Sequence, residues 1–374
     1  MALEIERAEG VFLFGKERQY IDLISGIGVS NVGHRHPKVV AAIKHQLDHY
    51  MHLMVYGEYV QSPQVKLAEA LAKTLPDPLD NVYLLNSGSE AVEGAIKLAK
   101  RYTGKPKIFS CVNAYHGSSH GALSASGDEG FKQNFRPLVP GFERIHYGSY
   151  SDLERIDHQV AAVLIETVQG EAGVVYACTP YFQELRERCN QTGTLVIFDE
   201  IQCGFGRTGK LWAFEHFQVQ PDILTSAKGM GGGMPIGCFV SSQAIMSVLK
   251  NDPILGHIST FGGHPVSSAA SLATLQVIQE ENLLDSVEAK ERLFREQLEH
   301  PKIKAIRSKG LLMAVEFESF EVVKPIIDRA IELGVITDWF LFNDRSMRIA
   351  PPLIITEAQI EQACEVILQA INES

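Results

Sequence analysis

Short, almost wholly apolar runs alternate with helix-forming segments along the first two thirds of this 374-residue chain. A strand that helices cover on both faces has such an apolar run, and consecutive strands joined through helices lie parallel. In the helix predicted over 89–102, Ala91, Ala95 and Leu98 share one stripe, and charged residues lie opposite. The pattern therefore predicts an α/β fold with a mostly parallel sheet. We expect its strands at 82–86, 107–112, 162–166, 195–199, 222–226 and 237–240, and a further helix at 180–192.

The pattern changes after about residue 265, where the helical segments lengthen and strands become few. The expected helices are 266–281, 283–298, 323–334 and 357–370, and the expected strands include 310–317 and 347–349. We therefore predict two domains. A large α/β domain spans 45–255, and a smaller α+β domain combines 1–44 with 256–374.

The charge balance and the cysteines restrict the class of protein. Lysine and arginine total 34 residues and aspartate and glutamate total 45, so the formal net charge is −11. A nucleic-acid-binding surface needs clustered basic residues, which this balance does not favour, although a few local donors can still hold a small anion. The six cysteines form no Cys-x-x-Cys pair, no signal peptide is evident, and no apolar run approaches the roughly 18 residues of a membrane span. We expect a cytoplasmic protein without nucleic-acid or membrane partners.

Ligands of an open parallel sheet bind where its strands end, at the carboxyl edge. Asp199 and Glu200 end the strand predicted at 195–199, where a carboxylate either faces solvent or is paired and used. The glycines that follow resemble a phosphate loop as far as Lys210. However, Leu211 stands where Ser or Thr would bind magnesium, and the loop follows the acidic strand directly. A nucleotide hydrolase is therefore excluded.

Lys228 also follows a predicted strand and is surrounded by glycines that lack the G-x-G-x-x-G spacing of a dinucleotide site. A lone lysine at a strand end is most often a solvated cation, but the glycines here leave room for a flat ligand. After the first strand, Ser87, Gly88 and Ser89 open a helix. They are either an ordinary N-cap or a phosphate site, because free N–H groups and the helix dipole favour anions there.

His116 and His120 are spaced as in many zinc helices, but the intervening Gly-Ser-Ser makes a helix improbable, so we expect no metal site. The same stretch matches the Gly-x-Ser-x-Gly elbow of serine hydrolases. It does not follow its strand at once, as an elbow must, and a flexible glycine-serine loop explains it better.

A lysine, a buried acid and a helix N-terminus together fit pyridoxal phosphate, a planar phosphorylated cofactor that binds lysine covalently. The acid keeps the pyridine nitrogen protonated, which makes the ring an electron acceptor.

The run DEIQCGFGRTGKLWAFEHFQVQPDILTSAKGMGGGMPIG resembles the signature of class III pyridoxal-phosphate-dependent aminotransferases. Similar motifs extend over nearly the whole chain, from YIDLISGIGVSNVGHRHPKVV through NSGSEAVEGAIKLAK and ETVQGEAGVV to STFGGHPVSSAA and MRIAPPLI. In overall pattern, acetylornithine and ornithine aminotransferases are the most similar members. The resemblance implies a fold-type I transferase and a homodimer with its active sites at the subunit interface.

The resemblance also implies residue roles. Lys228 would bind the cofactor covalently and then move a proton, and Asp199 would pair with the pyridine nitrogen. Gln202 would bind the phenolic oxygen, Tyr115 would stack on the ring, and Glu166 would support the site from the start of its loop.

Five further positions carry over to the phosphate and the substrate. Gly88 and Ser89 would hold the phosphate, assisted by Thr260 from the partner subunit. Glu171 and Arg348 resemble the family's switch pair, in which the arginine receives a substrate carboxylate when the glutamate swings away.

The chain departs from the nearest relatives at several positions. Ser118 stands where they carry an arginine that clasps a substrate carboxylate, His264 replaces an asparagine, and Thr167 replaces a proline. The chain also begins close to its first shared motif, so we expect the N-terminal arm of many relatives to be missing.

We predict an aminotransferase that moves an amino group from an ω-amino acid or related amine to a 2-oxo acid. A transaminase for a β- or γ-amino acid or another amine, with pyruvate as acceptor, remains an alternative. So does an aminomutase of the glutamate-semialdehyde type, which Gln202 disfavours. A non-enzymatic binding protein is disfavoured by the intact Lys228 and Asp199.

Overall fold

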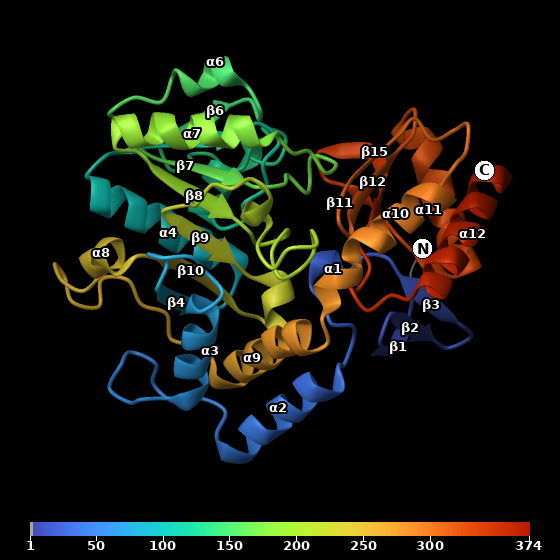
Figure 1. Cartoon of the computed structure of the whole chain (residues 1–374), viewed down its shortest axis with the longest axis horizontal. Coiled ribbons are helices and arrows are strands. Elements are labelled where there is room, and N and C mark those ends of the chain that lie inside the picture. The colour runs from blue at the N-terminus through green and yellow to red at the C-terminus, as the bar shows by residue number, and fades with distance from the viewer. Residues whose placement is uncertain (1–2) are drawn as a thin grey trace.

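The computed structural model describes residues 3–374, and its largest element is a seven-stranded sheet (Figure 1). Neighbouring strands run parallel except at β10, which is antiparallel to both of its neighbours. The predicted α/β fold with a mostly parallel sheet is therefore confirmed. In spatial order the strands are β4 (Asn81–Leu85), β10 (Gly237–Ser241), β9 (Ile223–Ser226), β8 (Leu195–Asp199), β7 (Val160–Glu166), β5 (Lys107–Cys111) and β6 (Phe142–Ile145).

Helices cover both faces of this sheet, because successive side chains of a strand point to opposite faces. On β7, Ala162 belongs to a hydrophobic cluster with α4 (Gly88–Thr103), whereas the next residue, Val163, belongs to the main core with α7 (Thr179–Thr192). Figure 1 shows α4 and α7 on opposite sides of the sheet. Two shorter helices complete the α4 side, α5 (His120–Ala125) and α8 (Gln243–Met246).

Helix α4 shows how local sequence positions the sheet edge. The Ser87 hydroxyl accepts the N–H of Glu90 at 3.2 Å, which caps the first turn. At the other end Gly104 adopts a left-handed φ of 68°, which stops the helix. The predicted stripe is buried against the sheet, and the predicted bounds differ from the observed ones by one residue at each end.

A second group of elements lies beside the large sheet and contains both chain ends (Figure 1). It holds two four-stranded sheets, in the orders β1-β2-β3-β13 and β11-β12-β15-β14. The first consists of β1 (Ile5–Glu9), β2 (Phe12–Gly15), β3 (Gln19–Asp22) and β13 (Val335–Ile336). The second consists of β11 (Ala305–Lys309), β12 (Leu312–Glu316), β14 (Trp339–Phe340) and β15 (Asn343–Ile349). Their helices are α10 (Val287–Gln297), α11 (Phe320–Leu333) and α12 (Glu357–Glu373).

Three helices connect the two groups: α2 (Pro37–His49), α3 (Ser62–Ala72) and α9 (Pro265–Glu280). Helix α9 packs on α2 and α3 and on the turn η3 (Lys228–Gly231), which follows the large sheet. The boundary predicted at 44/45 falls inside α2, and the one at 255/256 precedes α9. We keep the two-domain division as a proposal, and these contacts favour placing α2, α3 and α9 with the large sheet.

The structure differs from the predicted elements in detail. The helix expected over 283–298 begins as the 3₁₀ turn η5 (Leu283–Ser286) before α10, and β1 to β3, α2 and α3 were not predicted. The remaining short elements are α1 (Ser25–Gly28), α6 (Tyr150–Leu153), η1 (Gln133–Phe135), η2 (Ala213–His216) and η4 (Ser247–Leu249). Within residues 3–374, no helix combines the length and the apolar character needed to cross a membrane.

Candidate active site

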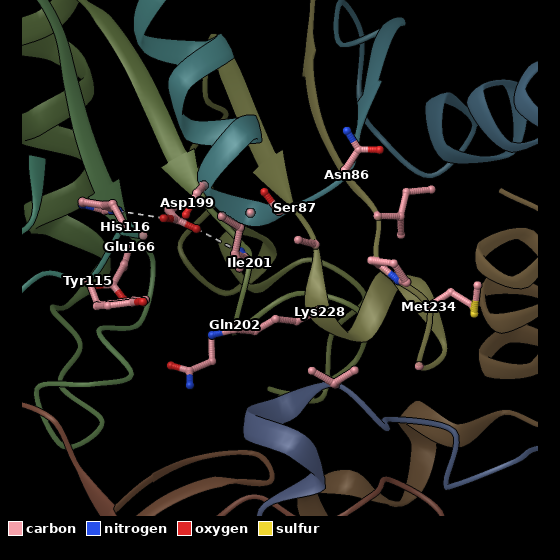
Figure 2. Close-up of a pocket in the computed structure, with 18 residues that line it drawn as sticks. Asn86, Ser87, Tyr115, His116, Glu166, Asp199, Ile201, Gln202, Lys228 and Met234 are labelled. Atoms are coloured by element: carbon pink, nitrogen blue, oxygen red, sulfur yellow. Dashed lines mark hydrogen bonds and ion pairs between the residues drawn. The ribbon is translucent and has the colours of Figure 1, made fainter. Parts of the chain in front are cut away.

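A cavity of about 450 Å³ opens at the carboxyl edge of the large sheet, where the sequence placed the ligand site (Figure 2). Strands β4, β5, β7, β8 and β9 all end there, so residues far apart in the chain meet at one place. The lining residues are Val29, Asn86, Ser87, Gly88, Ser89, Tyr115, His116, Gly117, Glu166, Asp199, Ile201, Gln202, Ala227, Lys228, Gly233, Met234, Pro235 and Ile236.

Asp199 is the last residue of β8 and is 3% exposed. Its Oδ2 lies 2.7 Å from His116 Nδ1, and its Oδ1 accepts the N–H of Ile201 at 3.0 Å; Figure 2 draws both bonds. His116 Nε2 has no hydrogen-bond partner, which favours the neutral tautomer that donates from Nδ1 to Asp199. The buried carboxylate is therefore paired, and it keeps its orientation toward the cavity.

His116 is the main site residue whose role sequence reasoning missed. The sequence offered it as half of a zinc pair or as part of a flexible loop. In the structure His116 supports Asp199, while His120 is exposed and contacts the Pro137 carbonyl. No sequence signal links His116 to Asp199, because β7 lies between β5 and β8 and only the folded sheet brings them together. Residues 3–374 contain no cluster of three or more metal-ligating side chains.

Glu166 ends β7 and lies directly across from Asp199 in the parallel register. Burial raises the pKa of Glu166 well above its usual value, and the negative charge of Asp199 raises it further. The N–H of Tyr115 reaches Glu166 Oε2 at 3.4 Å. Two neighbouring carboxyl groups in a dry site cannot both ionise easily, and the raised pKa of Glu166 favours the protonated form of this residue.

Lys228 follows β9 and begins η3 with a left-handed φ of 47°, which is unusual for a residue other than glycine. Burial lowers the pKa of Lys228 below its usual value, although the nearby Glu171 carboxylate acts to raise it. A lowered pKa makes the neutral, nucleophilic amine more accessible. The solvated-cation interpretation therefore does not apply to this lysine.

The Ser87–Ser89 stretch satisfies both of its sequence interpretations. Ser87 is the N-cap of α4, and Gly88 and Ser89 line the cavity at the start of this 16-residue helix. The first N–H groups of a helix have no partner within the helix, so they are available to an anion. A Cβ added to Gly88 would lie 3.0 Å from Ile201 Cδ1, so a side chain would narrow this end of the cavity.

Gln202 connects the cavity to the predicted switch pair. Its side-chain amide donates to Glu171 Oε1 at 3.1 Å, and Arg348 donates to both carboxylate oxygens of Glu171, at 3.0 and 2.9 Å. Burial acts to raise the pKa of Glu171, but the Arg348 guanidinium holds it below its usual value. Glu171 and Arg348 are themselves absent from the cavity lining and lie behind Gln202.

Thr260 is the one predicted cofactor residue that lies away from the cavity of its own chain. It is exposed, and its hydroxyl lies 3.4 Å from the hydroxyl of Tyr56. Its predicted role requires a second subunit and stays a prediction.

The acidic and basic residues near the glycine-rich run at 204–210 have structural partners. Glu200 is fully buried and accepts the N–H groups of Ala213 and Phe214 at 2.7 and 2.8 Å. Arg207 is also buried, and donates to the Leu311 carbonyl at 2.9 Å and to the Asn31 side chain. These contacts hold the loop in place, and none of residues 204–210 lines the cavity.

The residues present fit pyridoxal phosphate. The cavity offers a helix N-terminus to the phosphate, a carboxylate held by two donors to the ring nitrogen, and a half-buried lysine with a lowered pKa to the aldehyde. Its volume lies in the ordinary range of small-molecule sites. Fold and site together define a pyridoxal-phosphate-dependent enzyme of fold type I.

Comparison with known proteins defines the family. Residues 1–371 match the aminotransferase class-III family. The chain is 39% identical over 370 residues to the acetylornithine aminotransferase of Methanopyrus kandleri, covering 98% of this chain and 93% of that one. Among solved structures, a transaminase from the marine bacterium Virgibacillus has a TM-score of 0.93 at 30% identity, covering 100% of this chain and 93% of that one. The ornithine aminotransferase of Toxoplasma gondii has a TM-score of 0.93 at 32% identity, covering 100% and 91%. The chain belongs to the class III aminotransferases, and the predicted enzyme class and cofactor are confirmed.

Proposed function

We propose that this aminotransferase takes its amino group from an ω-amino acid of the ornithine or acetylornithine type and passes it to a 2-oxo acid. The observation that carries the proposal is that Lys228 and the His116–Asp199 pair line one cavity, and that Gln202 joins this cavity to the Arg348–Glu171 pair. Lys228 and the His116–Asp199 pair serve any amino transfer. Arg348 provides a cation that can bind a carboxylate, and both an amino acid and a 2-oxo acid carry one.

The proposed roles follow from the chemistry of each group. The bound cofactor supplies an electron-accepting ring. Lys228 Nζ would hold the cofactor and would also move a proton at the substrate carbon, for which it must be a neutral base. Asp199, oriented by His116, keeps the pyridine nitrogen protonated. Gln202 binds the phenolic oxygen.

Further residues are proposed to bind and orient. Tyr115 would cover one face of the ring, and the neutral Glu166 beside Asp199 would keep a second negative charge out of the site. Gly88 and Ser89 would hold the phosphate at the helix N-terminus.

We also propose that the chain forms a homodimer in which Thr260 of each subunit completes the other subunit's phosphate site. Exposed apolar side chains support this, since eleven of the nineteen large ones within residues 3–374 lie in two stretches, 47–65 and 254–261, and the second of these contains Thr260. Large exposed apolar groups close together in the sequence and around a functional loop indicate a protein–protein interface. They are Leu47, Met51, Leu53, Met54, Tyr59, Val60, Val65, Ile254, Leu255, Ile258 and Phe261. The six free cysteines, five of them buried, support a location in the reducing cytoplasm.

A second donor class is favoured by a specific observation. Ser118, at the position where the resemblance to acetylornithine and ornithine aminotransferases implies an arginine, is exposed, and its backbone N–H donates to Ser89 Oγ at 3.2 Å. Phe342 lies 6.5 Å from Tyr115 and 5.3 Å from Phe131 between ring centroids, so aromatic groups border this side of the site. A donor amine with an apolar body and no carboxylate, with pyruvate as acceptor, fits such a surface better than a donor or acceptor with a second carboxylate does.

The decisive experiment is a half-reaction panel on the cofactor-loaded enzyme. Acetylornithine, ornithine, β-alanine, γ-aminobutyrate and α-methylbenzylamine are mixed singly with the protein, and the absorbance of the cofactor is followed. Bleaching by the first two supports the ornithine-type proposal, and bleaching by α-methylbenzylamine alone refutes it in favour of the second class. Lys228→Ala should abolish the covalent attachment seen by mass spectrometry after borohydride reduction, whereas the exposed Lys210→Ala should retain it.

A further inference from the structure

Arg348 has a second carboxylate partner besides Glu171. The Oδ1 atom of Asp338 lies 3.0 Å from Nε of Arg348, whereas Glu171 binds the two terminal nitrogens of the guanidinium. The local fold fixes this arrangement, because the N–H of Arg348 on β15 donates to the Asp338 carbonyl at 2.8 Å, just before β14. The ring of Phe340 covers the guanidinium at 4.6 Å, so its surroundings are largely dry.

The contact between Asp338 and Arg348 acts mainly through charge. Neither Asp338 Oδ1 nor Arg348 Nε has a partner in hydrogen-bond geometry, although the two atoms are close. Burial raises the pKa of Asp338 to about 6, so the group is still ionised at pH 8. The other nearby carboxylate, Asp22, is bound to His34 at 2.7 Å and to two backbone N–H groups, so it does not serve as a counter-ion to Arg348.

The charges around Arg348 have a consequence for carboxylate exchange. With Glu171 in place, Arg348 faces two anions, Glu171 and Asp338, and the net charge of these three groups is −1. If Glu171 swings away, Arg348 and Asp338 remain and the net charge is zero, so no uncompensated cation is left in a buried site. An incoming substrate carboxylate then restores −1, the charge of the resting state.

We propose that Asp338 is a positioning residue that serves as the resident counter-ion of Arg348 and keeps the arginine compensated while Glu171 and a substrate carboxylate exchange places. The inference rests on the proposed function, in which Arg348 receives that carboxylate. Asp338 repels the carboxylate of Glu171 and that of the substrate alike. Removing Asp338 therefore strengthens the binding of Glu171 and of the substrate carboxylate to Arg348 about equally, and substrate affinity changes little while Glu171 is present. The full gain in substrate affinity shows only when Glu171 no longer competes.

The test is a double-mutant cycle of Glu171→Gln and Asp338→Asn in the cofactor-loaded dimer at pH 8, with KM and kcat measured for a 2-oxo acid and for α-methylbenzylamine. Asp338→Asn alone should change the KM of the 2-oxo acid less than about threefold. In the Glu171→Gln background, the same change should lower that KM about tenfold, because one nearby negative charge is removed. Neither constant should change for α-methylbenzylamine, because this amine has no carboxylate.

A second measurement does not depend on activity. The double variant should lose stability to urea beyond the sum of the single variants and regain it when succinate is added, since succinate supplies the missing anion. Asp344→Asn, an exposed position on β15, is the matched control and should change neither quantity.

Different results would refute the proposed function of Arg348 and the proposed role of Asp338. If Arg348→Gln leaves the KM of the 2-oxo acid unchanged, Arg348 does not receive the carboxylate and the proposed function is wrong at this point. If Arg348→Gln raises that KM but Asp338→Asn has no effect in the Glu171→Gln background, or if the urea data are additive, the role of Asp338 is refuted.

Discussion

Replacing His116 with phenylalanine removes the side-chain donor of Asp199 while keeping a flat ring in the buried space. The His116 side chain is fully buried, and its Nδ1 lies 2.7 Å from the carboxylate oxygen. Phenylalanine leaves Asp199 with the Ile201 N–H as its one remaining donor. The ionised carboxylate then loses stabilisation in a dry site, and with it part of its attraction for the protonated pyridine nitrogen.

The size of the effect follows from the kind of bond that is lost. A hydrogen bond to a charged group contributes about 1.5–3 kcal/mol, and a tenfold change in affinity corresponds to about 1.4 kcal/mol. We expect His116→Phe to weaken binding of pyridoxal phosphate by about tenfold to a hundredfold. His116→Asn can still donate from a side-chain N–H and should lose less affinity.

The assay is a titration of the cofactor-free protein with pyridoxal phosphate, followed by absorbance, with urea unfolding measured in parallel. His120→Phe is the matched control, because this histidine is exposed and contacts only the Pro137 carbonyl. Unchanged affinity of a folded His116→Phe variant would falsify the assigned role of the histidine. Equal losses for His116→Phe and His116→Asn would show that shape, and not hydrogen bonding, decides the affinity.

Three further predictions concern other parts of the site. Gly237→Ala should destabilise the protein by about 3 kcal/mol in urea unfolding, since its Cβ would lie 2.3 Å from the Ser87 carbonyl oxygen, and a stable variant would contradict this. Burial raises the pKa of Glu200 from 4.5 to about 7, so the folded state binds this proton more tightly than the unfolded chain does. The stabilising contribution of Glu200 is therefore complete below pH 4.5 and is lost, by about 3 kcal/mol, as the pH rises through 7. Glu200→Gln should remove this fall in the free energy of unfolding, measured between pH 5 and 8. Ser118→Arg should strengthen the use of 2-oxoglutarate, seen as an about tenfold lower KM, by adding a carboxylate clamp. Ser118→Gln should not, and equal effects of the two would refute the account of this position.

Much of the large sheet and most of the cavity were predictable from local patterns. A strand buried on both faces is apolar throughout, so β7 and β8 are evident in the sequence, and the rule for carboxyl edges then places Asp199 and Lys228 together. The direction of β10 was not evident, because an apolar run has the same composition whichever way it runs. Short edge strands such as β13 owe their structure to pairing with a distant strand, here β3, and carry little signal of their own.

The site residues divide in the same way. Residues whose chemistry is fixed by type and motif, such as Lys228, could be proposed from the sequence, and the family comparison supports the chemistry they imply. Residues that act through a neighbour could not. His116 and Asp338 each owe their proposed role to one short contact, with Asp199 and Arg348 respectively, and those contacts join separate loops and strands.

The sequence alone thus determined the α/β class through its periodicity and suggested the cofactor through a few residue types. The kind of reaction followed from the resemblance of its motifs to class III aminotransferases. Only the tertiary structure decided which carboxyl group has its pKa raised by burial beside another, and which histidine supports the site. It also showed how many anions surround Arg348. Ionisation and hydrogen bonding depend on burial and on distances of a few ångströms between residues as far apart as 171 and 348. Those distances exist only once the chain has folded.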